Sequence, residues 1–282
     1  MNKINFIADV FAEQHLGGGE LSNQELISLL RKKDIVVDQL LSTQVTEDFI
    51  SENRGDKYIV GNFMGLKEDV KKYLTDNCQY VIYEHDHKYI TSRDPSVYED
   101  YLAPEEHIIN KEFYKAAKSV FCQSKLHTDV VRKNLKIDNI KSVGGNLWSD
   151  STLQLLGELS KKKKKDRYSI WDSSNPIKNT PLTVAYCTRQ NIPYDLVGFL
   201  PYEKFLEKIT DNNTFIFLPE TLETLCRVAV ECRMAGMKVI TNKKIGASSE
   251  DWFKLKGQDL IDFMAEKKHK ICEEIEEILN ES

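Results

Sequence analysis

Two glutamates stand at a spacing that suits ligand binding. Glu223 and Glu231 are eight residues apart in the stretch from Thr214 to Asn242, TFIFLPETLETLCRVAVECRMAGMKVITN. Glu223 is expected at a strand-to-helix turn. Eight residues are a little over two helical turns, so both carboxylates fall on the same side, about 12 Å apart by helical rise. Thr224 and Leu225 would then offer backbone N–H groups at the helix N-terminus, where a phosphate binds readily.

Glu231 needs a partner in such a helix. The face that carries it is otherwise apolar, and a carboxylate buried there without a partner is costly. A ribose diol would serve as that partner. The alternative interpretation is an ordinary amphipathic helix with two solvated acidic residues.

The surrounding residues predict a strand, a helix and a second strand. Residues 215–218 are a short apolar run of the kind that is buried on both faces of a sheet. Apolar residues at helical spacing follow, and Gly236 is a natural C-terminal stop. Residues 237–240 form the next strand. This order is a βαβ unit, so we expect a parallel sheet.

This stretch resembles the donor-binding motif of retaining GT-B glycosyltransferases of the glycogen-synthase-like and mannosyltransferase-like type. That motif is Glu, seven residues and Glu, followed by a small residue, Gly and an apolar strand. The resemblance implies that Glu223 faces the donor sugar and that Glu231 holds the ribose hydroxyls. It also implies that the backbone of Thr224 and Leu225 contacts the diphosphate. The family usually has Gly-Phe-Gly after the first Glu, and here Thr224-Leu225-Cys226 takes its place.

A lysine upstream fits the same resemblance. Residues 168–171 predict a strand, and a polar loop leads from it into a helix over 180–190. The family has a Lys in this loop that neutralises the donor diphosphate, and Lys178 matches it. The family also has an Arg five residues earlier, where this chain has Ser173. Lys88, Arg93 or Arg227 could compensate, and weak donor binding is the alternative.

The N-terminal half begins with a strand and a glycine-rich loop. Residues 4–11 predict the strand, and Gly17, Gly18 and Gly19 precede a helix expected over 21–33 with Ser22 as its cap. Strand, glycine-rich loop and helix form the phosphate-approach geometry of nucleotide-binding α/β folds. The segment Gly17-Gly18-Gly19-Glu20 also resembles the GGxE loop of these glycosyltransferases, which faces the donor phosphates. A plain flexible turn is the alternative.

Titratable residues follow a strand predicted over 79–83. Glu84, His85, Asp86 and His87 come directly after it, at the strand end where α/β enzymes place their sites. The resemblance implies that His85 lies near the donor sugar, and we take His85 and then Asp86 as catalytic candidates. A zinc site is one alternative because His-x-His can ligate zinc, although no other Cys or His cluster completes a set. A solvated loop is the other alternative.

Composition limits the class of protein. The 282 residues suit two domains, and a net charge of -5 with a pI of about 5.8 argues against nucleic-acid binding. Six cysteines without a CxxC pair indicate reduced thiols and a cytoplasmic protein. No apolar run is long enough for a transmembrane helix. The five lysines over 161–165 are expected in a solvated interdomain loop, with weak peripheral membrane contact as the alternative.

These observations and the resemblance predict an α/β protein of two Rossmann-like domains that face each other across a cleft, with a C-terminal helix crossing back. The expected domains are 1–150 on the acceptor side, 151–265 for the nucleotide sugar, and the helix 266–282. His85 and Glu223 are expected to line the shared cleft.

The expected activity is transfer of a hexose from a UDP- or GDP-linked sugar to a carbohydrate or other hydroxyl acceptor. The resemblance implies retention of configuration and no required metal or cofactor. A nucleotide-sugar epimerase of the same fold, and a non-catalytic nucleotide-sugar-binding protein, are the alternatives.

Overall fold

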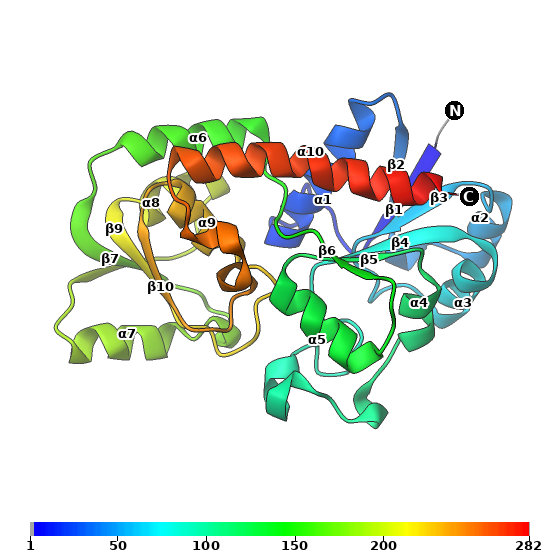
Figure 1. Ribbon diagram of the computed structural model, residues 1–282, viewed down its shortest axis with the longest axis horizontal. Coiled ribbons are helices and arrows are strands. Elements are labelled where there is room, and N and C mark those ends of the chain that lie inside the picture. The colour runs from blue at the N-terminus through cyan, green and yellow to red at the C-terminus, as the bar shows by residue number, and fades with distance from the viewer. Residues whose placement is uncertain (1–2, 282) are drawn as a thin grey trace. The chain divides into compact units, whose positions relative to one another are not determined.

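The structure is a computed structural model that describes residues 3–281 (Figure 1). The chain divides into two compact α/β units. The first unit contains the residues up to Leu147 and those from Lys267 onward, and the second unit is Trp148–Glu266. Each unit is built on its own parallel sheet, which confirms the predicted class of two Rossmann-like α/β units.

The first unit has a six-stranded sheet with the order β2-β1-β3-β4-β5-β6, and all its neighbouring strands are parallel. Its strands are β1 (Lys3–Ala8), β2 (Val36–Leu41), β3 (Lys57–Val60), β4 (Gln79–Glu84), β5 (Val120–Cys122) and β6 (Ile140–Ser142). The strand order reverses between β1 and β3. Ligands of open parallel sheets bind beyond the carboxyl ends of the strands at such a reversal.

Helices cover both faces of this sheet. They are α1 (Gly18–Arg31), α2 (Glu47–Glu52), α3 (Glu68–Asn77), α4 (Lys111–Ala116) and α5 (Lys125–Leu135). Successive strand side chains point to opposite faces. Phe6 and Ile59 therefore pack in one core with side chains from α1, whereas Ile7 and Val60 pack in a second core with side chains from α3, α4 and α5. Short 3-10 turns complete the unit: η1 (Ser42–Gln44), η2 (Pro95–Val97), η3 (Glu99–Tyr101) and η4 (Glu105–His107).

The second unit has a four-stranded parallel sheet with the order β10-β9-β7-β8. Its strands are β7 (Lys165–Trp171), β8 (Tyr194–Val197), β9 (Asn212–Phe217) and β10 (Lys238–Thr241). Its helices and 3-10 turns are α6 (Asp150–Lys161), η5 (Pro176–Lys178), α7 (Thr180–Arg189), α8 (Tyr202–Ile209), α9 (Arg227–Met234), η6 (Gly246–Ser249) and η7 (Asp251–Lys254). Here the strand order reverses between β7 and β9, so the loops after these two strands leave the sheet side by side.

One long helix belongs to both units. Helix α10 covers Gln258–Asn280, and the unit boundary falls within it, after Glu266. Leu260, Ile261 and Met264 pack in the main core of the second unit. Five later residues pack with α1 in a core of the first unit: Ile271, Cys272, Ile275, Ile278 and Leu279.

Helix α1 begins earlier than its residues predict. The helix was expected over 21–33 with Ser22 as its cap, but it begins at Gly18 and Gly17 is the N-cap. Ser22 is instead buried inside the helix, where its Oγ lies 2.8 Å from Oη of Tyr83. Two of the three glycines are therefore the first turn of the helix rather than a loop before it.

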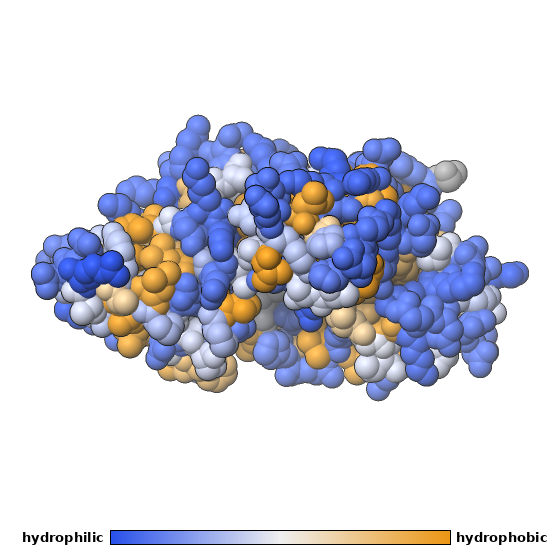
Figure 2. Space-filling view, turned by 90° about the horizontal axis from the view of Figure 1, so that it is seen from below, coloured by the Kyte–Doolittle hydropathy of each residue, from blue (hydrophilic) through white to orange (hydrophobic). Residues whose placement is uncertain are grey.

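The lysine run joins α6 to β7 inside the second unit. One member departs from the expectation of a solvated loop. Nζ of Lys164 donates to the carbonyl oxygens of Leu159 at 3.1 Å and of Thr210 at 2.8 Å, and burial lowers its pKa. Figure 2 shows one face of the molecule, on which apolar residues lie scattered among hydrophilic ones. No helix within residues 3–281 is long and apolar enough to cross a membrane.

Candidate functional site

A charged pair marks the strand reversal of the second unit. Lys178 lies in the loop after β7, and Glu223 lies in the loop after β9. Nζ of Lys178 is 2.5 Å from Oε1 of Glu223, and the two side chains are only 17% and 16% exposed. The structure thus brings together two predicted site residues that are 45 positions apart.

Local structure holds Lys178 in place. It ends the 3-10 turn η5, which Asn175 caps by accepting a hydrogen bond from the backbone N–H of Ile177. Asn179 then takes a left-handed backbone with φ of 55° and is the N-cap residue of α7, which begins at Thr180. The ammonium group lies 5.4 Å from the ring centroid of Trp171, the last residue of β7. Contacts with the aromatic face and with the Glu223 carboxylate hold the ammonium group in place at the end of the sheet.

Glu223 does not lie on the helix that carries Glu231. Helix α9 begins at Arg227, and Cys226 before it takes a left-handed backbone with φ of 72°. Glu223 instead forms a parallel bridge with Ile245: its N–H donates to the carbonyl of Lys244 at 2.9 Å, and its carbonyl accepts from Gly246 at 2.8 Å. The expectation that helical spacing relates the two carboxylates, starting from a turn at Glu223, is therefore wrong. Thr224 and Leu225 likewise precede the helix instead of forming its first turn.

Glu231 is fully buried and its two carboxylate oxygens differ. Oε1 accepts three hydrogen bonds, from Nε1 of Trp148 at 2.9 Å, Oη of Tyr202 at 2.6 Å and Nε of Arg227 at 2.8 Å. Oε2 has no hydrogen-bond partner among the described residues. Buried polar atoms normally have one. The carboxylate therefore keeps one unused acceptor, as a group that receives a ligand hydroxyl would.

Aromatic side chains enclose this carboxylate. The guanidinium of Arg227 lies 4.5 Å from the ring centroid of Trp148. Burial, together with the neighbouring Glu231 carboxylate, raises the pKa of the Tyr202 phenol. Tyr202 therefore stays protonated and donates. Arg227 and Glu231 are four residues apart on one helix, and this spacing is the sequence signal for their ion pair.

In the first unit, Gly19 packs against His85. A Cβ built on Gly19 would come within 3.2 Å of Cγ and 3.3 Å of Cβ of His85. Gly18 and Gly19 form the first turn of α1 after β1, and His85 directly follows β4. The structure thus brings the predicted Gly19 and the predicted histidine together at the carboxyl end of the sheet. A larger residue at position 19 would press on the imidazole.

Two buried amides contact the ring of His85. Its Nε2 lies 2.6 Å from Oδ1 of Asn23, and its Nδ1 contacts Nε2 of Gln123. The ring also packs edge-on against Tyr83, with centroids 4.4 Å apart. These contacts fix the ring in one orientation. Asn23 and Gln123 come from α1 and from the residue after β5, and no local sequence signal links them to His85.

Asp86 points to a different partner. Its carboxylate accepts from Nε of Arg93 at 2.7 Å and also contacts the same guanidinium through Nη2. Burial alone would raise the pKa of Asp86, but the charges of Lys88 and Arg93 outweigh it and hold the pKa below its ordinary value. Asp86 is therefore an ionised anchor for Arg93, which has a left-handed backbone with φ of 53°.

A buried ion pair supports this segment. Glu84 and Lys88 are both fully buried and their charged groups are in contact. Glu84 also accepts from the hydroxyl of Tyr114 and, at 2.8 Å, from the backbone N–H of Asp86. The pair thus holds the residues around His85. Its four-residue spacing is visible in the sequence, but its burial is not.

No group of three or more His, Cys, Asp or Glu side chains arranged to hold a metal ion occurs within residues 3–281. The rings of His87 and His127 pack edge to face, with centroids 5.0 Å apart. The pKa of His127 is well below its ordinary value because the ring is buried.

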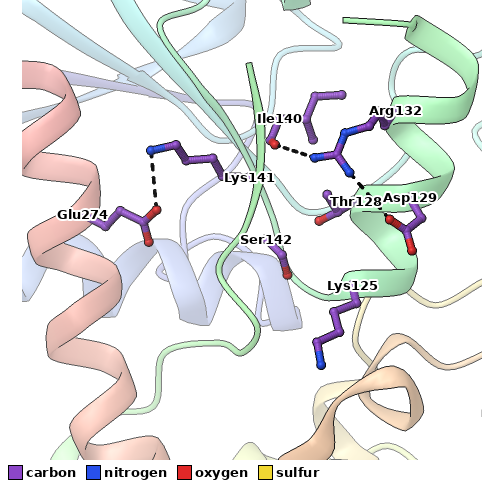
Figure 3. A pocket seen from close by; sticks show the side chains of 8 residues that line it. All are labelled: Lys125, Thr128, Asp129, Arg132, Ile140, Lys141, Ser142 and Glu274. Carbon is purple, nitrogen blue, oxygen red and sulfur yellow. Dashed lines mark hydrogen bonds and ion pairs between the residues drawn. The ribbon is translucent and has the colours of Figure 1, made fainter. Parts of the chain in front are cut away.

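Hollows elsewhere carry none of the predicted site residues. One of 520 Å³ lies between α5, β6 and α10. Figure 3 shows two ion pairs in its lining, Lys141 with Glu274 and Arg132 with Asp129. Another, of 340 Å³, is lined by Trp252 and Phe263 with acidic neighbours. We place the candidate site at the carboxyl ends of the strands in each sheet, because the predicted residues Lys178, Glu223 and His85 follow those strands.

No family model and no curated protein matches the chain. Solved structures match it along its whole length. The chain has the GT-B fold. A glycosyltransferase from Rickettsia africae is 12% identical with a TM-score of 0.56, covering 100% of this chain and 99% of that one. Sucrose-phosphate synthase from Thermosynechococcus elongatus is 12% identical with a TM-score of 0.57, covering 99% and 95%. HepE of Anabaena in complex with UDP and glucose is 12% identical with a TM-score of 0.52, also covering 99% and 95%.

Proposed function

We propose that the protein transfers a hexose from a nucleotide-diphosphate sugar to an acceptor hydroxyl, with retention of configuration. The observation that carries the proposal is the half-satisfied carboxylate of Glu231, which is buried in the same unit as the Lys178–Glu223 pair. A free acceptor oxygen suits a ribose hydroxyl, and a cation at the strand reversal of the same unit suits a diphosphate.

Each donor group has a residue that suits it. Glu231 would accept from the ribose, Lys178 would contact the diphosphate, and Glu223 would face the sugar. The backbone of Thr224 and Leu225 would approach the diphosphate from the loop before α9. Lys178 is already paired with Glu223 at 2.5 Å, so the donor phosphate would share this cation with the carboxylate.

The chemistry depends on stabilising the diphosphate as it leaves. Positive groups held in place before the reaction lower the barrier, because no reorganisation is needed when charge develops. Lys178 and the glycine-rich start of α1 would supply them, and the scheme requires no metal ion. Ser173 in place of an arginine removes one cation, so we expect weaker donor binding than in proteins that have both.

The first unit would serve the sugar and the acceptor. His85 would contact the transferred sugar, with Gly19 packed against its ring, and Gly18 would approach the donor phosphates from the start of α1. Asp86 would act through Arg93, which it holds by an ion pair. The solved structures support the proposed sugar transfer, by analogy of fold: HepE was solved with UDP and glucose, and the Rickettsia africae protein is named a glycosyltransferase.

Titration calorimetry with UDP, GDP and their glucose and mannose derivatives tests the donor site. We expect saturable heat for one nucleoside diphosphate and its sugars, and the matching sugar then enters an acceptor screen. Product anomeric configuration is measured by NMR. Absence of saturable binding to every ligand would overturn the proposal. Release of nucleoside diphosphate without any acceptor would instead indicate an epimerase.

A further inference from the structure

A chain of hydrogen bonds leads from the backbone to His85. It begins at Leu147, whose backbone N–H donates to Oδ1 of Asn146 at 2.7 Å. A backbone N–H is always a donor, so this contact fixes which atom of the Asn146 amide is oxygen. The amide nitrogen, Nδ2, must then point the other way. It lies 3.2 Å from Oε1 of Gln123 and donates to it.

The same argument assigns the donor and the acceptor in the next hydrogen bond. Because Oε1 of Gln123 accepts from Asn146, its Nε2 is the atom that faces His85, and it contacts Nδ1 of the ring. An amide NH₂ group only donates, so Nδ1 must accept and carries no proton. The proton of the neutral ring is then on Nε2, which donates to Oδ1 of Asn23 at 2.6 Å. The backbone N–H of Leu147 thereby sets the tautomer of His85 through the side chains of Asn146 and Gln123.

The three amide side chains of this hydrogen-bond chain, which we call the relay, are buried. Asn23, Gln123 and Asn146 are all nearly or fully buried. The backbone of Gln123 is fixed as well: its N–H donates to Nδ1 of His127 at 3.2 Å, and its carbonyl accepts from Gly145 at 2.9 Å. Turning one of these amides over would place N–H against N–H, or oxygen against oxygen. Such a contact costs more free energy when it is buried than when water can solvate it.

We propose that Asn146, Gln123 and Asn23 are positioning residues that hold His85 as the neutral ring with its proton on Nε2. The consequence for catalysis rests on the proposed glycosyl transfer. His85 then serves the reaction as a neutral ring of fixed orientation and not as a general base, because Nδ1 accepts from Gln123 and the proton on Nε2 is donated to Asn23. The tautomer itself does not depend on the activity and is measured separately.

The first test is NMR of the ring nitrogens in ¹⁵N-histidine-labelled protein, with His85→Gln used to assign the signal. We expect the shift of an unprotonated nitrogen at Nδ1 and of a protonated one at Nε2. Asn146→Asp offers two acceptors, so Gln123 must turn to donate to it, which places an oxygen opposite Nδ1. We expect Nδ1 of His85 to become protonated in this variant, whereas the His127 signals stay unchanged.

Activity supplies the second test. Asn146→Asp should lower kcat by roughly 10- to 100-fold, as expected for a misplaced catalytic group, with the KM for the donor nearly unchanged. If Asn146→Asp fails to fold, Gln123→Glu replaces it, because a carboxylate beside Nδ1 also demands a proton there. A wild-type His85 protonated on Nδ1, or a folded variant with an unmoved tautomer, would overturn the relay. A wild-type protein with the expected tautomer and no transferase activity would overturn the proposed function instead.

Discussion

Glu231→Gln separates the ligand role of this carboxylate from its role in folding. The side chain keeps its shape and one acceptor oxygen for the donors from Trp148, Tyr202 and Arg227. Its amide nitrogen replaces Oε2, the oxygen without a partner among residues 3–281. Glu231→Ala is a poorer test, because it leaves the Arg227 guanidinium buried without its partner at a cost of about 3–5 kcal/mol in folding free energy.

The two effects of Glu231→Gln have separate magnitudes. Hydrogen bonds to a charged group contribute about 1.5–3 kcal/mol and neutral ones about 0.5–1.5 kcal/mol, so the loss of charge beside Arg227 should lower the free energy of unfolding by roughly 1–2 kcal/mol. The same difference applies to a ribose hydroxyl that donates to Oε2. We therefore expect nucleoside diphosphate affinity to fall by about 5- to 30-fold.

Calorimetry with two ligands isolates the ribose contact. We would compare the preferred nucleoside diphosphate with its 2′,3′-dideoxy form in the wild type and in Glu231→Gln. Removing the hydroxyls should weaken wild-type binding strongly and the variant's binding much less, as in a double-mutant cycle. Glu25→Gln is the matched control, because Glu25 is also buried and lies 3.1 Å from Nζ of Lys268 in the first unit. An equal loss for the dideoxy ligand in both proteins would refute the ribose role of Glu231.

Three further predictions concern the other residues. Lys178→Met should weaken binding of the nucleoside diphosphate far more than binding of the nucleoside, and equal losses by calorimetry would contradict a phosphate contact. His127 stays neutral in the folded state because burial lowers its pKa, while in the unfolded state it titrates near 6.5. The free energy of unfolding should therefore fall as pH drops below about 6.5, by up to ~1.4 kcal/mol per pH unit, and urea unfolding of His127→Gln should show a shallower dependence. Gly19→Ala should slow turnover because its Cβ would lie 3.2 Å from Cγ of His85, whereas Gly55→Ala, with nothing within 4 Å, should not.

The sheets were predictable because their strands are short apolar runs. Residues 215–218 and 79–83 were expected as strands and lie in β9 and β4, which end within one residue of the expected ends. Parallel pairing followed from the helix between strands, and the positions of Lys178 and His85 just after strands followed as well. Such features depend on nearby residues and on the common rules of α/β topology.

The environment of the acidic residues was not predictable in the same way. A left-handed Cys226 delays α9 until Arg227, and neither residue type signals this. Cysteine rarely takes that conformation, so the Glu223–Ile245 bridge and the packing around it override local preference. The partners of Glu231 and His85 come from distant elements, such as Trp148 and Gln123, and only the tertiary fold brings them near.

Helix α10 has a consequence for how the protein is made. Ile271, Ile275 and their neighbours complete a core of the first unit, yet all residues of the second unit lie between them and Leu147 in the chain. At roughly 5–20 residues per second, a ribosome needs on the order of 10 s to add Trp148–Glu266. During that interval the nascent first unit exposes the apolar surface that α10 later covers. We therefore expect it to depend on chaperones during synthesis, although N-terminal domains generally fold first.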